Sequence, residues 1–212
     1  ARLAAAKASI AKLLAVKGPR TLANTLTPYD EALRQLDMMG SQSNLISEVH
    51  PDSATRSVGE KLVQEASAYG TELSLNHDVY NALAALDLSG VDAQTRHYVT
   101  RALRDFRLAG VDKDDATREK IRKLSDEIVE IGQEFGRNIR EDKRPFQVDA
   151  SALAGLPQDF VDRHKAGADG KITLTVDYPD AVPVFTYASN EALRKQMYME
   201  YNNRAFPKNI DV

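Results

Sequence analysis

Apolar residues recur at spacings of three and four along most of the chain, which is the pattern of amphipathic α-helices. The first stretch, residues 1–16, places Leu3, Ala6 and Ile10 on one face before Gly18-Pro19 interrupts it. The same spacing predicts further helices starting at Thr27, over about 52–75, after Asn76 and over about 92–109. The chain is therefore predicted to be mainly helical.

Residues that favour helix ends support several of these boundaries. Thr27 is a candidate N-cap, Pro28 suits the first helical position, and Asp30 faces the positive end of the helix dipole. The polar stretch 40–44 is expected to follow the end of this helix. Gly110 is expected to end the helix over 92–109.

The longest predicted helix runs from about Asp112 to about Asp142. Its apolar residues again recur at spacings of three and four, with charges of both signs on the other face: Ile121, Leu124, Ile128, Ile131, Phe135 and Ile139. Such a stripe is expected to be core rather than a ligand site. If Phe135 is buried, its truncation to Ala lowers the free energy of unfolding by about 3–5 kcal/mol.

The pattern changes after Pro145. Residues 172–176 alternate as a half-buried strand does, and Tyr178-Pro179-Asp180 is expected to turn the chain. Residues 182–187 are expected to be a second extended piece, which Pro183 confines to a sheet edge. Ser189 or Asn190 then caps a last helix that runs to Arg204.

The predicted fold class is thus mainly α, a multi-helix, bundle-like assembly with a β-hairpin or short strands near residues 171–187. Two regions are expected, a helical domain over 1–150 and the start of a following segment over 151–212. The chain opens without Met and closes without a tail-like composition, so both ends are interpreted as cuts.

Composition excludes several classes of protein. The chain has no Cys, which rules out disulfides and thiolate metal sites. Its net charge of −3 shows no basic excess, so a nucleic-acid partner is not expected. No apolar run approaches the roughly 20 residues that cross a bilayer, so no membrane partner is expected either.

The residues offer no catalytic motif. The four histidines are His50, His77, His97 and His164, and no two of them are four residues apart with a Glu between them. No Gly-x-Ser-x-Gly and no phosphate-binding glycine loop is present. Four surface or loop histidines are favoured over a cluster of metal ligands.

One basic feature remains. Arg101, Arg104 and Arg107 are spaced by three on one predicted helix, with Arg96 nearby. Such a stripe suits a carboxylate or phosphate ligand. Ion pairing with neighbouring helices rich in Asp and Glu is the favoured alternative, because exposed charge runs are usually solvated.

Several segments together resemble the amino-terminal part of the thimet oligopeptidase, neurolysin and oligopeptidase A family of zinc metallopeptidases. They follow one another in order over nearly the whole chain: TLANTL at 21–26, YGTEL at 69–73 with Asn76, RDFRLAGVD at 104–112, Leu124-Ser125 with QEFGRNI at 133–139, LAGLP at 153–157, LRKQMY at 193–198 and YNNRA at 201–205.

This resemblance implies a parent enzyme that hydrolyses short peptides with zinc, in a deep channel between two largely helical parts. The family's His-Glu-x-x-His helix and third zinc-binding Glu lie in a later portion, so no catalytic, cofactor-binding or metal-binding residue is assigned to this chain. The chain is expected to form one wall of the channel and to bind no zinc by itself. Its expected partners are short peptides and a carboxy-terminal catalytic half, with a cytoplasmic location as the family default and export left open.

Two alternatives remain. The chain is either a stand-alone helical module that binds peptides or serves as a scaffold, or a relative whose later half is also inactive. A piece severed from its partner half is expected to expose a large apolar face and to associate. A self-contained module is expected to stay monomeric.

Overall fold

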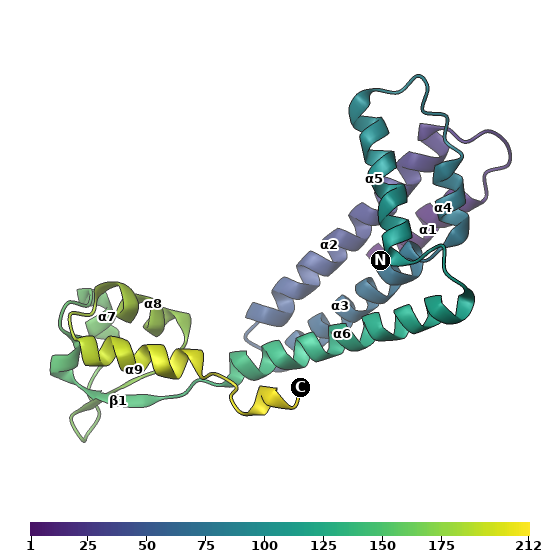
Figure 1. Ribbon diagram of the computed structural model, residues 1–212. Helices are drawn as coiled ribbons and strands as arrows, with labels where there is room; N and C mark the ends of the chain where they lie inside the picture. Colours follow the sequence, from purple (N-terminus) through teal and green to yellow (C-terminus); the bar gives the residue numbers. More distant parts are fainter. The chain divides into compact units, whose positions relative to one another are not determined.

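The computed structural model describes all 212 residues as two compact units, Ala1–Glu130 and Ile131–Val212. The division falls inside one long helix, α6 (Asp115–Glu141), which contributes residues to both units (Figure 1). Helices make up most of each unit and one small antiparallel sheet completes the chain, so the predicted mainly α fold class is confirmed. None of the helices has the length and apolar character that crossing a membrane requires.

The first unit is built around α2, along which α1 and α3 both pack (Figure 1). Its elements are α1 (Arg2–Leu14), the π-helical turn η1 (Leu22–Leu26), α2 (Thr27–Val49), α3 (Ser53–Ser74), α4 (His77–Ala84), α5 (Ala93–Ala109) and the first part of α6. The core draws on every helix from α1 to α5, with members that include Ile10, Leu13, Tyr29, Leu36, Leu73, Leu83, Val99 and Phe106. The predicted helices over 52–75, after Asn76 and over 92–109 are confirmed.

Side-chain caps start most of these helices. Asp52, Asn76 and Asp92 each accept a hydrogen bond from the backbone N–H three residues on, at 2.7–3.0 Å. The prediction that Thr27 is a cap was wrong, because η1 runs directly into α2. The cap lies six residues earlier at Thr21, which forms a reciprocal capping box with Asn24.

The predicted end of α2 near residues 40–44 was also wrong, since α2 continues to Val49. The small residues of this stretch let α3 approach closely. Ser43 and Ser47 are buried, and a Cβ atom built on Gly59 of α3 would lie 2.8 Å from the Ser43 carbonyl oxygen and from the Ser47 nitrogen. The polar stretch is therefore a helix–helix contact and not a loop.

Gly110 ends α5 as predicted. Its φ of 100° lies in the left-handed region that glycine favours, and Val111 N–H donates to the Phe106 carbonyl at 3.0 Å. This is the hydrogen bond of a Schellman cap. The cap places Val111, which is 1% exposed, in the core of the first unit.

The apolar stripe of α6 lies on the surface, so the prediction that it belongs to the core was wrong. Leu124, Ile128, Ile131 and Phe135 are 47%, 69%, 48% and 46% exposed. The only buried residue on this helix of 27 residues is Asn138. Periodicity establishes that a helix is amphipathic but does not supply the surface that covers it.

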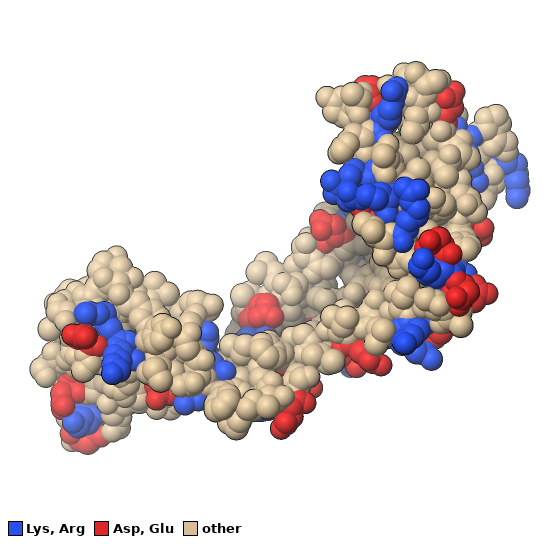
Figure 2. Space-filling model, in the orientation of Figure 1, with Lys and Arg blue, Asp and Glu red and all other residues tan.

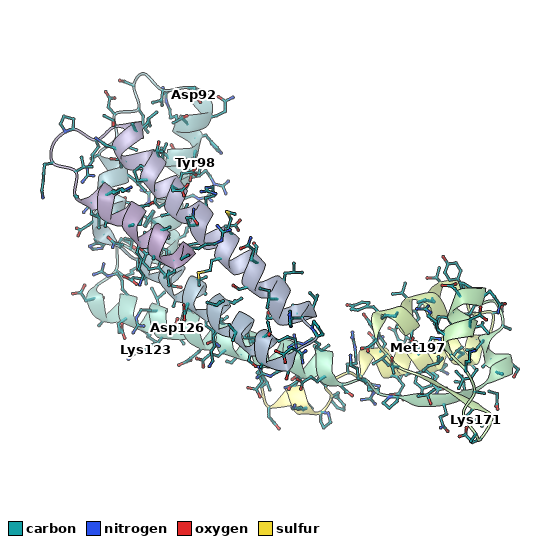
Figure 3. All side chains as sticks on the ribbon, turned by 180° about the vertical axis from the view of Figure 1, so that it is seen from behind. Asp92, Tyr98, Lys123, Asp126, Lys171 and Met197 are labelled. Carbon is teal, nitrogen blue, oxygen red and sulfur yellow. The ribbon has the colours of Figure 1, made fainter.

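The second unit combines a small sheet with helices around one hydrophobic core. Its elements are the end of α6, β1 (Phe146–Asp149), the 3₁₀ turn η2 (Ala150–Leu153), α7 (Gln158–Arg163), β2 (Lys171–Leu174), α8 (Tyr178–Tyr187), α9 (Glu191–Asn202) and the 3₁₀ turn η3 (Lys208–Ile210). The strands are antiparallel, with Phe146 opposite Leu174 and Asp149 opposite Lys171. The core includes Phe160, Leu174, Val176, Val184 and Met197, the last of which is labelled in Figure 3.

The predicted strand near residue 172 is confirmed, but its partner is β1 rather than residues 182–187. That second segment is the helix α8, which starts at Tyr178, so Tyr178-Pro179-Asp180 forms a first helical turn. Pro179 suits that turn, whereas Pro183 lies inside the helix and provides no N–H to donate to the Pro179 carbonyl. Asn190 caps α9 through Leu193 N–H at 3.1 Å, as predicted.

Two phenylalanines test the contrast between the core of the first unit and the exposed stripe. Phe106 is 3% exposed, so Phe106→Ala is expected to lower the free energy of unfolding by about 3–5 kcal/mol. Phe135→Ala is expected to cost less than about 1 kcal/mol, because the ring is already half in water. Urea unfolding followed by circular dichroism measures both. Equal losses for the two variants would show that the α6 stripe is covered.

Candidate functional site

A hollow lies between α2 and α5 in the first unit. It has a volume of about 660 Å³ and is lined mainly by apolar and aromatic surface. Tyr29 and Leu33 contribute from α2, and His97, Tyr98 and Arg101 from α5. Figure 3 labels Tyr98 on α5. A hollow of this size and character suits an extended peptide side chain or a small apolar ligand.

Two tyrosines give the hollow its polar character. Tyr29 is 7% exposed, and burial beside Asp105 and Asp30 raises the pKa of its hydroxyl to about 12. The Tyr98 hydroxyl donates to Asp30 Oδ1 at 3.1 Å. Burial, the charge of Asp30 and this hydrogen bond raise the pKa of Tyr98. Both phenols are thus held neutral and serve as hydrogen-bonding groups, not as bases.

The arginine stripe lies on α5, where Figure 2 shows Lys and Arg atoms gathered on one side of the first unit. Arg104 pairs with its neighbour Asp105 at 2.8 Å, and Arg96 donates to the carbonyl oxygens of Leu88 and Val91. These contacts stay within α5 and the loop before it. The favoured interpretation, ion pairing with neighbouring helices, is therefore wrong for these two arginines, and only Arg101 of the stripe reaches the hollow.

The four histidines lie apart. His50 follows the end of α2, His77 begins α4 beside the Val111 carbonyl, and His97 is exposed on α5. No group of three or more His, Cys, Asp or Glu side chains is placed to hold a metal ion. The prediction of surface or loop positions fits three of them, but His164 is part of a largely buried network.

His164 is hydrogen-bonded through both ring nitrogens. Nδ1 lies 2.8 Å from the Phe160 carbonyl oxygen and Nε2 lies 2.9 Å from Asp180 Oδ1. The other oxygen of Asp180 accepts from the Thr175 N–H at 2.8 Å and from its hydroxyl at 3.0 Å. Both ring nitrogens are therefore occupied by hydrogen-bond partners. The pair joins the end of α7 to α8.

Neither arrangement contains an activated nucleophile. The hollow binds through aromatic surface and neutral phenols, and the histidine of the second unit has both nitrogens occupied. Sequence reasoning missed Tyr29, Tyr98 and Asp180 because their partners are distant along the chain. Only the arrangement of Asp30 next to Tyr29, in the first turn of a helix, was visible as a local signal.

Known proteins are similar to this chain over most of its length. Oligopeptidase A of Salmonella typhimurium is 27% identical over 96% of the chain, and oligopeptidase A of Escherichia coli is 26% identical over 93%. Saccharolysin of Saccharomyces cerevisiae is 24% identical over 89%. No family model matches the chain.

The similarity covers only part of each relative. The chain spans 32%, 31% and 28% of the lengths of these three proteins, or about a third. The resemblance predicted from the sequence is confirmed, because the curated homologues are oligopeptidase A, saccharolysin and thimet-like oligopeptidase.

The raised pKa of Tyr29 predicts a loss of stability at alkaline pH. The unfolded phenol ionises near pH 10 and the folded one near 12, so the unfolded state binds fewer protons between these values and stability falls as pH rises. A shift of about two units corresponds to about 2–3 kcal/mol. Denaturant unfolding at pH 9 and pH 11.5 should show this extra loss in the natural chain and not in Tyr29→Phe. Identical pH dependence of the two proteins would contradict it.

The His164–Asp180 pair is expected to stabilise the second unit. His164→Ala leaves Asp180 Oδ1 without its imidazole hydrogen-bond partner, and the side chains are only 15% and 12% exposed. A loss of about 2–4 kcal/mol in unfolding free energy is expected, somewhat below the range for fully buried pairs. Arg163→Ala is the matched control, because its side chain is 57% exposed, and it should cost less than about 0.5 kcal/mol. Equal effects would refute a structural role for the pair.

Proposed function

We propose that this chain, a homologue of oligopeptidase A and saccharolysin, is the amino-terminal part of a zinc-dependent oligopeptidase that hydrolyses short peptides. In this proposal the chain forms one wall of the substrate channel and performs no chemistry itself. The downstream portion supplies the His-Glu-x-x-His helix, the third zinc-binding Glu and the general base.

The observation that carries the proposal is the extent of the similarity. Seven relatives, six named oligopeptidase and one saccharolysin, match 87–96% of this chain at 22–27% identity, while the chain spans only 26–32% of their lengths. A match that runs nearly end to end through the shorter chain supports a piece of the longer architecture rather than a shared small motif. The exposed apolar stripe of α6 supports the same interpretation.

The residues of this chain do not fit a catalytic zinc ion. Such a site needs three protein ligands in tetrahedral positions with one position left for water. His50, His77, His97 and His164 lie apart, and no carboxylates gather with any of them into a set of three. When bound in the parent, zinc would polarise the scissile carbonyl and activate a water molecule. No step of that reaction is assigned to a residue of this chain.

The hollow between α2 and α5 is this chain's contribution to peptide binding under the proposal. Tyr29 and Tyr98 offer aromatic faces and neutral hydroxyl groups, and Arg101 offers a cation at the edge. These groups suit an apolar peptide side chain next to a backbone or terminal carboxylate. The same hollow favours the rival function, a stand-alone peptide-binding module, so binding alone does not separate the two.

The boundary near residue 150 and the cytoplasmic compartment stay predictions. A relative from Arabidopsis thaliana, named organellar oligopeptidase A, chloroplastic/mitochondrial, is 24% identical over 87% of this chain. Similarity to such relatives therefore does not fix one compartment.

The test compares this chain with the protein extended through its natural downstream sequence. A short internally quenched fluorescent peptide is expected to be cleaved by the extended protein with zinc and not by the 212 residues alone. A chelator is expected to abolish the cleavage and added zinc to restore it. Replacing the downstream Glu of His-Glu-x-x-His by Gln should lower the rate by at least about 100-fold, since general acid–base catalysis contributes roughly that much.

Three results would contradict the proposal in different ways. An extended protein without the His-Glu-x-x-His sequence would favour the non-catalytic module. An extended protein that carries the sequence but stays inactive with every short peptide tried would favour an inactive relative. Zinc-dependent cleavage by the 212 residues alone would place the active site within this chain.

A further inference from the structure

The exposed stripe of α6 has the regular spacing of a helix–helix seam. Its residues are Ile121, Leu124, Ile128, Ile131 and Phe135, separated by three, four, three and four positions. This alternation averages 3.5 residues and is the a/d pattern of helices that pack side by side at a shallow angle. A broader apolar face would be expected if a sheet or an irregular surface covered the helix. The occupant is therefore itself a helix.

Ile121, at the start of the seam, lies against Gly110 at the end of α5. From Leu124 onward the seam is free for such an occupant, because this part of α6 meets α3 through another face. Asp126 and Val129 line a small hollow together with Gln64 and Ala68 of α3, whereas Leu124 and Ile128 are 47% and 69% exposed. Figure 3 labels Asp126, together with Lys123, on this part of α6. The side of α6 that lies beside α3 thus carries both polar and apolar residues, and the most apolar side of α6 is exposed to solvent.

The charges beside the seam indicate what the occupant carries. In the seven-residue repeat that puts Ile121, Ile128 and Phe135 at equivalent positions, the flanking positions on one edge are Lys120, Glu127 and Glu134, all exposed, so the part of this edge beside Ile128 and Phe135 is acidic. The other edge has Ser125 and Gly132. Flanking positions in such pairs select partners by charge. A matching helix therefore carries Lys or Arg along the edge that meets the two glutamates.

The same charges disfavour a second copy of this chain. An antiparallel pair of α6 helices that buries all four exposed stripe residues brings Glu127 of one copy beside Glu134 of the other. A parallel pair in register sets Glu127 against Gly132 and Glu134 against Ile139, with no opposite charge. Like charges at these positions destabilise the pair, and uncharged residues add no electrostatic attraction to it.

We propose that the α6 seam is the docking surface for a helix of the parent protein that follows Val212, with basic residues along one edge. The length of the relatives supports this occupant, because this chain spans only about 32% of the first of them and the remainder must pack against something. The proposal rests on the proposed function only in requiring a longer parent. It goes beyond that function by naming the α6 seam as the surface of this chain that the rest of the parent protein covers.

The absence of Cys makes the seam directly measurable by thiol labelling. Ile128→Cys introduces a thiol at the most exposed stripe position, and Lys123→Cys introduces a matched one on the polar side of the same helix, where the side chain is 66% exposed. Both are made in the 212-residue chain and in the protein extended through its natural downstream sequence. The rate of reaction with a maleimide reagent is then compared.

The thiol at 128 is expected to react at least about tenfold more slowly in the extended protein than in the short chain, while the thiol at 123 reacts equally fast in both. Equal rates at 128 in the two proteins would overturn the proposal. Protection at 128 that is already present in the short chain and grows with its concentration would also overturn it, in favour of a second copy. Sedimentation velocity on the same samples reports that association.

A charge variant tests the basic edge separately. Glu127→Lys combined with Glu134→Lys in the extended protein is expected to raise the labelling rate at 128 by at least about threefold, because like charges then meet across the seam. An unchanged rate would overturn the assignment of a basic edge. Glu119→Lys, on the polar side, is the control and should leave the rate unchanged.

Peptide cleavage by the extended protein is measured on the same samples, so the two proposals fail independently. Active enzyme with a reactive thiol at 128 would refute the docking surface and leave the oligopeptidase function intact. Inactive protein with a protected thiol would refute the function and support the docking surface.

Discussion

An amphipathic helix is stable only when another surface covers its apolar face, and this constraint decides the structure of both units. In the first unit this cover is supplied to α2 by α1 and α3, which pack along it, and Leu36 and Met39 of α2 are buried. Each such side chain contributes about 1.5–3 kcal/mol when fully buried. The close approach of α3 depends on Gly59, where a larger residue would strike the α2 backbone.

α6 is also amphipathic, but no other element covers most of its apolar face. Its charged side is satisfied within the helix, for example by Arg122 with Glu119 at 2.7 Å and with Asp126 at 3.5 Å. Such exposed pairs contribute only a few tenths of a kcal/mol each. Burial of the apolar side by another surface would therefore stabilise this helix more than its surface ion pairs do. A protein in which that gain is realised has more chain than these 212 residues, or a partner.

The polar groups of the chain are arranged for structure and binding rather than for catalysis. No buried side-chain nitrogen or oxygen lacks a hydrogen-bond partner, and the His164–Asp180 network uses every acceptor that faces the ring. Tyr29 and Tyr98 are held neutral beside the α2–α5 hollow. Such neutral aromatic groups can bind a ligand through hydrogen bonds and apolar contact.

The sequence by itself determined the features that depend on near neighbours along the chain. Caps at Asp52, Asn76 and Asn190 act over three residues, and the left-handed turn at Gly110 needs only the glycine. The family resemblance likewise rests on local segments in order, and the histidine spacings alone argued against a zinc helix. Most helices were therefore predictable.

Only the tertiary structure decided which surfaces meet. Small polar residues at 40–44 are typical of a loop, yet contact with α3 keeps them helical. Residues 182–187 have strand-forming side chains, yet they continue a helix that packs on α9, and β1 takes their place beside β2. The spacing of the α6 stripe is typical of a buried helix face, yet four of its residues are exposed. A repeating pattern specifies that a face is apolar, but it contains no information about the segment that covers that face.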